Sequence, residues 1–288
     1  MDADLDTLCI TVYCMADDLL PAKARNHRRS VNDAELITLA VAQAIMGIPS
    51  DGRFLAVARK RLRHLFPKLP KRPGYWKRRD RLADQIEALI DVFARECPGY
   101  SDSVVLLDST PVECGRSRQT VERSALADAA GYGYCRSHSR YFWGMRFHGC
   151  FGLDGTPRGA ILWSADRPER EVAAELLPRV VRGGEAVVCD KGYAGADFEA
   201  AVAELGALVV RPARKDEPPT GFRLSAIRQR IESVYQTLKD VLTLECHGAR
   251  TLRSLRVRIA QRLLALAACV YVNHWLGRPS RSLVAYVA

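Results

Sequence analysis

The sequence has 288 residues, of which 48% are hydrophobic and 26% charged, as expected for a globular protein with a core of its own. Its 43 Lys and Arg outnumber 33 Asp and Glu, and the net charge of +10 favours polyanionic partners, with an inert basic surface as the alternative. The longest apolar run, 263–272, is too short to span a bilayer and predicts a buried helix. We therefore exclude a membrane as the reason for the charge.

The nine cysteines are an odd number without a CxxC pair, which argues against a disulfide framework and indicates a reducing, cytoplasmic compartment. The acidic first ten residues do not resemble a basic secretory signal. Cys135, His138, His148 and Cys150 form C-x-x-H and H-x-C pairs. These spacings lack the paired CxxC of common zinc sites. We therefore favour the interpretation that the four residues lie in the core over the alternative that they bind zinc.

Residues 1–99 are expected to be helical. Apolar residues recur at helical spacing in four segments, 5–20, 30–47, 54–66 and 79–96, with a Pro- and Lys-rich connector at 68–76. Ser30 or Asn32 is a candidate cap for the second segment, which stops at Gly47.

Basic residues dominate between Arg53 and Arg81, with Tyr75 and Trp76 among them. Short helices with one basic segment are typical of a helix-turn-helix DNA-binding module, and also of any small bundle with a solvated basic face. DNA contact is the favoured interpretation. The candidate DNA-binding residues of this region are Arg59, Lys60, Arg61, Arg63, Lys77, Arg78 and Arg79.

From residue 103 the pattern changes to strands. Buried or alternating runs predict strands at 103–108, 140–153, 159–165, 185–190 and 207–213, and helical spacing predicts helices at 170–181, 196–206, 224–244 and 250–275. The pair 140–153 and 159–165 is expected to be antiparallel across a Gly/Pro turn. The order of these elements predicts a mixed α/β sheet with flanking helices rather than a barrel.

Segment 115–140 is rich in Arg, Ser and Gly and shows little apolar periodicity. It is expected to be a mobile loop, either for binding DNA ends or as a disordered insertion. Among the neighbouring aromatics, Trp143 is expected in the core. For Trp163, two alternatives remain open: packing in the core and stacking on a DNA base.

Two predicted strands end on an aspartate, Asp108 in VVLLDSTPVE and Asp190 in AVVCDKGY. Neighbouring parallel strands place their carboxyl ends on one edge of the sheet, which would bring both carboxylates together. Glu232, on the predicted helix IRQRIESVYQTLK, is the candidate third carboxylate. Three converging carboxylates favour Mg²⁺ or Mn²⁺, and two such ions support in-line phosphoryl transfer.

The same helix carries Arg228 four residues before Glu232, Tyr235 three after it and Lys239 seven after it, all on one face. Arg228, Lys239 and the loop residue Lys191 are predicted to hold phosphates. Tyr193 and Tyr235 complete the set of predicted DNA-binding residues, with Tyr193 shaping the loop after Asp190.

Three motifs, LLDSTPVE, VVCDKGYAG and RIESVYQTLK, resemble those of bacterial insertion-sequence transposases of the DDE type, and the resemblance covers about residues 100–275. In that family an Asp lies on the first strand, a second follows the fourth strand in an Asp-x-Gly-Tyr stretch, and a Glu lies on a late helix. Asp108, Asp190 and Glu232 match these places in order. Ser225 stands where the family commonly has Tyr, three residues before Arg228.

The resemblance implies a ribonuclease H-like catalytic domain at 100–288, with a helical tail, after a helical DNA-binding region at 1–99. It further implies a transposase that cleaves element ends and joins the 3′-hydroxyls to target DNA with two Mg²⁺ or Mn²⁺ ions. The expected partners are the terminal inverted repeats and target DNA, bound by a homodimer in the bacterial cytoplasm at the nucleoid.

Two alternatives remain open at the level of sequence. The same carboxylates would serve a structure-specific nuclease or resolvase that cleaves without joining. A non-catalytic helix-turn-helix regulator or an inactive copy of an element is the alternative from another class, and an intact carboxylate triad argues against it.

Overall fold

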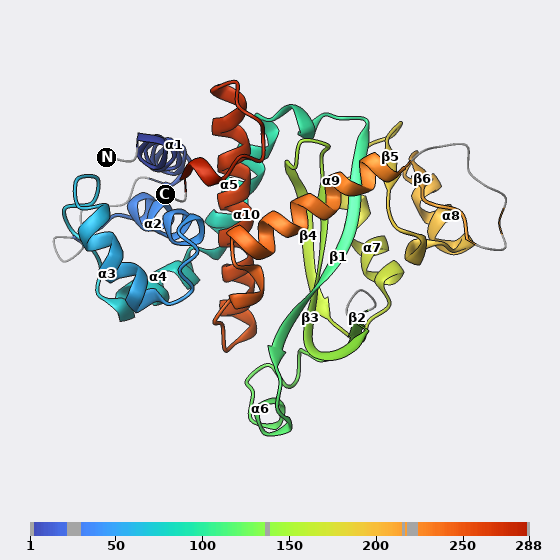
Figure 1. Ribbon diagram of the computed structural model, residues 1–288, viewed down its shortest axis with the longest axis horizontal. Helices are drawn as coiled ribbons and strands as arrows, with labels where there is room; N and C mark the ends of the chain where they lie inside the picture. The colour runs from blue at the N-terminus through green and yellow to red at the C-terminus, as the bar shows by residue number, and fades with distance from the viewer. Residues whose placement is uncertain (1–2, 22–29, 136–138, 215–216, 218–223, 287–288) are drawn as a thin grey trace. The chain divides into compact units, whose positions relative to one another are not determined.

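The computed structural model describes residues 3–21, 30–135, 139–214, 217 and 224–286 (Figure 1). These residues form two compact units, one from Met1–Glu96 with Thr237–Ala288 and the other from Cys97–Gln236. The structure thus groups the carboxyl-terminal helices with the amino-terminal ones, while the functional division at residues 99 and 100 stays a prediction.

The unit Cys97–Gln236 is built on a mixed sheet whose six described strands run in the order β2-β3-β1-β5-β6, with β4 paired to β3. Strand β3 pairs antiparallel with β1 along one edge, and with β2 and then β4 along the other. Strands β5 and β6 run parallel to β1. The strands are β1 (Val104–Gly115), β2 (Gly131–Cys135), β3 (Arg140–Phe151), β4 (Pro157–Ser164), β5 (Ala186–Val188) and β6 (Leu208–Val210).

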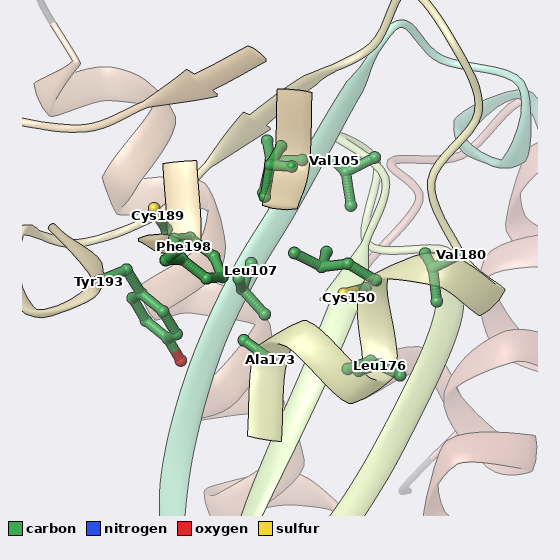
Figure 2. Close-up of a cluster of buried hydrophobic side chains, with 12 residues drawn as sticks. Val105, Leu107, Cys150, Ala173, Leu176, Val180, Cys189, Tyr193 and Phe198 are labelled. Atoms are coloured by element: carbon green, nitrogen blue, oxygen red, sulfur yellow. The ribbon is translucent and has the colours of Figure 1, made fainter. Parts of the chain in front are cut away.

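Helices α7 and α8 cover one face of this sheet, as Figure 2 shows. Alternate residues of β1, among them Val105 and Leu107, point to that face and pack with Cys150 and Cys189 against the helices, because successive side chains of a strand alternate between its two faces. The intervening residues, Leu106 and Asp108, belong to the opposite face. The helices of this unit are α6 (Arg118–Glu122), α7 (Glu169–Leu176), α8 (Ala196–Glu204) and α9 (Ser225–Gln236).

The other unit is helical, and its long helix α10 (Leu252–Trp275) is buried along most of its length. Its apolar run 263–272 explains that burial and confirms the predicted buried helix. Asn32 caps α2 in a capping box with Glu35, which decides between the two predicted caps. The remaining helices are α1 (Ala3–Leu19), α2 (Asp33–Ile45), α3 (Asp51–Arg61), α4 (Arg72–Arg81) and α5 (Ala83–Arg95).

Two expectations about irregular segments are wrong. The predicted mobile loop 115–140 holds the short helix α6 and the strand β2, whose backbone pairs with β3 although its sequence, GYGYC, has no apolar run. Helix α4 begins inside the predicted connector 68–76, because Pro73 lies in its first turn, where the missing N–H is tolerated.

The predicted fold class is confirmed: a mixed α/β sheet with flanking helices follows a helical amino-terminal region in the sequence. In the part of the chain that the structure describes, no helix has both the length and the apolar character needed to cross a membrane.

Candidate carboxylate pocket and basic surface

Asp108 and Asp190 lie side by side just past the point where the parallel pairing of β1 and β5 ends. The predicted strand end at Asp108 is wrong, because β1 continues to Gly115 through its antiparallel pairing with β3. The last residues that pair between β1 and β5 are Leu106 and Val188, and each aspartate follows two residues later. Because side chains alternate, a spacing of two residues places both carboxylates on the face opposite α7 and α8. The predicted parallel arrangement of these two strands is confirmed.

Local hydrogen bonds orient both aspartates. Asp108 Oδ1 accepts from the Ser109 N–H at 2.8 Å. Asp190 Oδ1 accepts from the Gly192 N–H and caps the short 3₁₀ turn Lys191–Tyr193. A Cβ at residue 192 would lie 2.7 Å from Asp190 Oδ1, so the glycine keeps the turn close to the carboxylate. Asp190 is therefore a turn cap as well as a candidate metal ligand.

Glu232 joins the two aspartates from α9. All three carboxylates line one pocket of about 80 Å³, together with Arg228 and Ile231. The Glu232 side chain is 65% exposed, and its Oε1 lies 4.0 Å from Arg228 Nη2.

The donor chemistry of this pocket fits a hard divalent cation, which prefers carboxylate oxygens. Among the described residues, however, no group of three or more His, Cys, Asp or Glu side chains is close enough to hold a metal ion as it stands. A metal site of all three carboxylates would therefore require the exposed Glu232 side chain to turn toward the two aspartates.

The predicted phosphate-binding residues near the pocket differ in exposure. Lys191 is exposed, and Arg228 is exposed on the pocket's rim, so both are accessible to DNA. Lys239 belongs to the helical unit, where its Nζ lies 3.6 Å from Glu245 Oε1. Its part in the site stays a prediction.

The two tyrosines of the predicted DNA-binding set are buried. Tyr193 is fully buried, and its ring packs on Phe198. Tyr235 is 5% exposed. Burial, together with the charge of Asp108, raises the pKa of both hydroxyls well above the usual range, so both keep their protons. Burial argues against direct DNA contact by either side chain, and we leave both out of the DNA-binding set proposed below.

A polar group of Ser109, Arg146 and Glu169 next to Asp108 was not predicted from the sequence. Ser109 Oγ donates to Glu169 Oε1 at 3.0 Å, and Arg146 on β3 forms an ion pair with the same carboxylate oxygen. Arg146 also donates to the carbonyl oxygen of Tyr134 at 3.0 Å, which ties β2 to β3. An arginine inside a buried aromatic strand requires a partner, and that was the one sequence signal for this group.

In the helical unit, five of the predicted DNA-binding residues are exposed: Arg59, Lys60, Arg61, Arg63 and Lys77. Arg78 is half-buried, donates to the carbonyl oxygen of Val31 at 2.9 Å and forms an ion pair with Asp33. It is therefore engaged within the unit.

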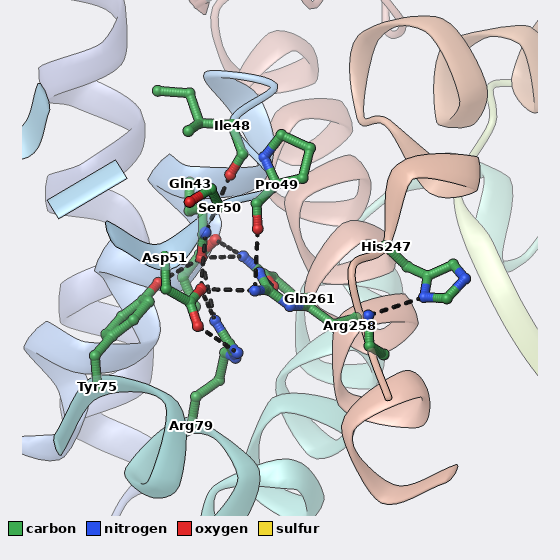
Figure 3. A network of polar contacts seen from close by, with 12 residues as sticks. Gln43, Ile48, Pro49, Ser50, Asp51, Tyr75, Arg79, His247, Arg258 and Gln261 are labelled. Atoms are coloured by element: carbon green, nitrogen blue, oxygen red, sulfur yellow. Dashed lines mark hydrogen bonds and ion pairs between the residues drawn. The ribbon is translucent and has the colours of Figure 1, made fainter. Parts of the chain in front are cut away.

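Arg79 is buried in a polar network, which Figure 3 shows. Its Nη1 lies 2.9 Å from Asp51 Oδ1, and Arg258 Nη2 on α10 lies 2.6 Å from the same oxygen. Gln43 Nε2 donates to that oxygen at 3.0 Å, and the Tyr75 hydroxyl donates to Gln43 Oε1 at 2.8 Å. Arg79 therefore holds helices together, and its burial argues against a DNA contact.

Of the remaining candidates, His148 and Trp143 lie in the core and Trp163 is half-buried. His148 is buried, and burial with the charge of Arg146 lowers its pKa to about 3, so its ring is neutral. His138, the second histidine of the zinc alternative, lies outside the described residues. Trp143 is buried as predicted, and Trp163 packs under the Arg167 guanidinium at 4.4 Å from the ring centroid.

Comparison with known protein families identifies a match over the strand-rich part of the chain and beyond it. The family described as transposase DDE domain matches residues 99–268, which is more than half of the chain. No curated protein and no solved structure matches the chain.

Proposed function

The chain belongs to the transposase DDE domain family, and from that premise we propose that it cleaves DNA at the ends of an insertion sequence and joins the freed 3′-hydroxyls to target DNA. The observation that carries this proposal is the shared pocket of Asp108, Asp190 and Glu232. Its place is beyond the carboxyl end of β5, where the parallel pairing with β1 stops, and α/β sheets commonly bind ligands at the carboxyl ends of parallel strands.

Asp108, Asp190 and Glu232 would hold two Mg²⁺ or Mn²⁺ ions. Such ions, when bound, activate a water or a 3′-hydroxyl and stabilise the leaving oxygen. The backbone N–H groups of Ser109 and Gly192 hold the two aspartates in place for this task. Arg228 Nη2 lies 4.0 Å from Glu232 Oε1, and with Lys191 it would supply positive charge for phosphate oxygens.

DNA binding is assigned to the exposed basic residues of the helical unit, Arg59, Lys60, Arg61, Arg63 and Lys77, with Arg228, Lys191 and Lys239 as phosphate contacts. The net charge of +10 supports this assignment, because neutralised phosphates release counterions and so drive binding. Transposition brings two element ends together, so a homodimer on DNA, in the cytoplasm at the nucleoid, is part of the proposal.

The proposed activity is tested with duplexes that carry the terminal repeats flanking the gene, and with shuffled duplexes as the control. We expect Mg²⁺-dependent nicking at the repeat ends and joining of the 3′-hydroxyl strand to a plasmid. Nicking without joining would assign a nuclease or resolvase. Specific binding without nicking at any Mg²⁺ or Mn²⁺ concentration would assign a regulator or an inactive copy.

The double variant Arg59→Ala/Lys60→Ala is expected to weaken DNA binding about equally for all sequences. Each lost phosphate contact lowers the slope of log affinity against log salt by about 0.9, so the slope should fall by about 2. Fluorescence anisotropy between 50 and 200 mM KCl measures it, with the exposed Arg256→Ala on α10 as the control. An unchanged slope would remove these two residues from the DNA-binding surface.

A further inference from the structure

The hydroxyl of Tyr235 lies between two strands of the sheet at the position of Asp108. It donates to the carbonyl oxygen of Asp108 at 2.5 Å and accepts from the Gly149 N–H at 3.1 Å. Asp108 and Gly149 are paired residues on β1 and β3. In an antiparallel pair, facing residues alternate between pairs that exchange backbone N–H···O bonds and pairs that do not. At this pair the Tyr235 oxygen bonds to a backbone group of each strand.

Gly149 creates the place that the Tyr235 ring occupies. Phe147, Gly149 and Phe151 follow one another on the same face of β3, with the glycine in the middle. The Tyr235 ring meets both phenylalanines edge-on, at centroid distances of 6.1 and 5.8 Å. A Cβ at residue 149 would lie 2.5 Å from the Phe151 ring, so the site accepts no larger residue without movement.

We propose that Tyr235 is a positioning residue, which fixes α9 on the sheet so that Glu232 reaches the two aspartates. Tyr235 follows Glu232 by three residues and therefore lies one helical turn away, on a neighbouring part of the same face. Its hydroxyl is anchored to the backbone of Asp108 itself. A shift of α9 along or around its axis would break both hydrogen bonds and carry Glu232 away from the pocket.

This role rests on the proposed metal-dependent cleavage and replaces the DNA contact predicted for Tyr235 from sequence. The two roles differ in what they change. A positioning residue alters the rate and the metal requirement of the bound complex, whereas a DNA contact alters the affinity for DNA.

Tyr235→Phe is the decisive variant, because it removes the hydroxyl and keeps the ring between the phenylalanines. We expect a 10- to 100-fold loss in kcat, the usual effect of removing a group that supports a metal ligand, and a higher Mg²⁺ concentration for half-maximal rate. The Kd for repeat DNA should stay unchanged. Tyr286→Phe is the matched control, since its hydroxyl donates to Asn273 Oδ1 at 2.7 Å in the other unit.

The outcomes of this experiment distinguish a failure of the positioning role from a failure of the proposed activity. A Tyr235→Phe enzyme with wild-type kcat and Mg²⁺ dependence, or with weakened DNA binding alone, overturns the positioning role and leaves the proposed activity intact. Absence of Mg²⁺-dependent cleavage in the wild type overturns the proposed function instead.

If Tyr235→Phe does not fold, a variant with p-aminophenylalanine at position 235 tests the positioning role in its place. Its amino group keeps a donor for the Asp108 carbonyl oxygen, and it should restore the wild-type rate and Mg²⁺ requirement. A folded p-aminophenylalanine variant with a rate reduced as in a triad variant would overturn the proposal.

Discussion

Asp190→Asn is expected to lose DNA cleavage by about 1,000-fold or more while it folds and binds DNA like the wild type. A neutral amide cannot neutralise a divalent cation as a carboxylate does. Metal-assisted stabilisation is worth several kcal/mol, and about 1.4 kcal/mol corresponds to a tenfold change in rate. The Asn side-chain oxygen still accepts from the Gly192 N–H, so the turn cap is retained.

The rate is measured under single-turnover conditions with saturating DNA and Mg²⁺. Asp197→Asn is the matched control, because Asp197 is exposed in the first turn of α8 and does not line the pocket. Equal cleavage by wild type and Asp190→Asn would reduce Asp190 to a turn cap and remove the carboxylate triad from the mechanism.

Asp51→Ala is expected to destabilise the helical unit by about 3–5 kcal/mol, the usual cost of removing one partner from a buried ion pair. The substitution leaves Arg79 and Arg258, both nearly fully buried, without the carboxylate that lies between them. Urea denaturation followed by circular dichroism measures the loss.

Asp4→Ala is the control for that measurement, because Asp4 forms an ion pair with Arg278 in which both side chains are about one-third exposed. Exposed pairs contribute little to stability, so we expect little change. A similarly small effect of Asp51→Ala would show that the network of Figure 3 does not hold the helices together.

The same carboxylate predicts how stability depends on pH. Desolvation opposes the charge of Asp51, but the hydrogen bond from Arg79 and the charges of Arg79 and Arg258 outweigh it and lower its pKa. A lowered folded-state pKa gives stability that is present above the unfolded value of about 3.9 and is lost as the pH falls through the folded value. Below pH ~4, the wild type should therefore lose more stability than Asp51→Ala.

The sequence was sufficient to predict that the strands leading to Asp108 and Asp190 are parallel neighbours. Both aspartates close short apolar runs, and parallel neighbours place their carboxyl ends together. The register of Leu106 with Val188 confirms this arrangement. The strands were predictable because strand periodicity is a local property of the chain. The end of the first strand was not, because β1 continues past Asp108 to Gly115 through its pairing with the distant β3.

Features that depend on distant partners could not be predicted in the same way. Arg79 stands in a basic run typical of an exposed surface, yet its partner Asp51 is 28 residues away in the sequence. Tyr235 bonds to a backbone atom 127 residues away. Strand β2 has no apolar pattern, because its pairing with β3 rests on backbone hydrogen bonds.

The most direct test of the proposed site is the location of Mn²⁺ in crystals of the protein with repeat DNA. Anomalous diffraction identifies Mn²⁺ among oxygen ligands without assumptions about the rest of the structure. We expect Mn²⁺ bound by the carboxylates of Asp108 and Asp190, with Glu232 rotated toward it from α9. Mn²⁺ bound only elsewhere, with these three carboxylates accessible, would contradict a metal-dependent site in this pocket.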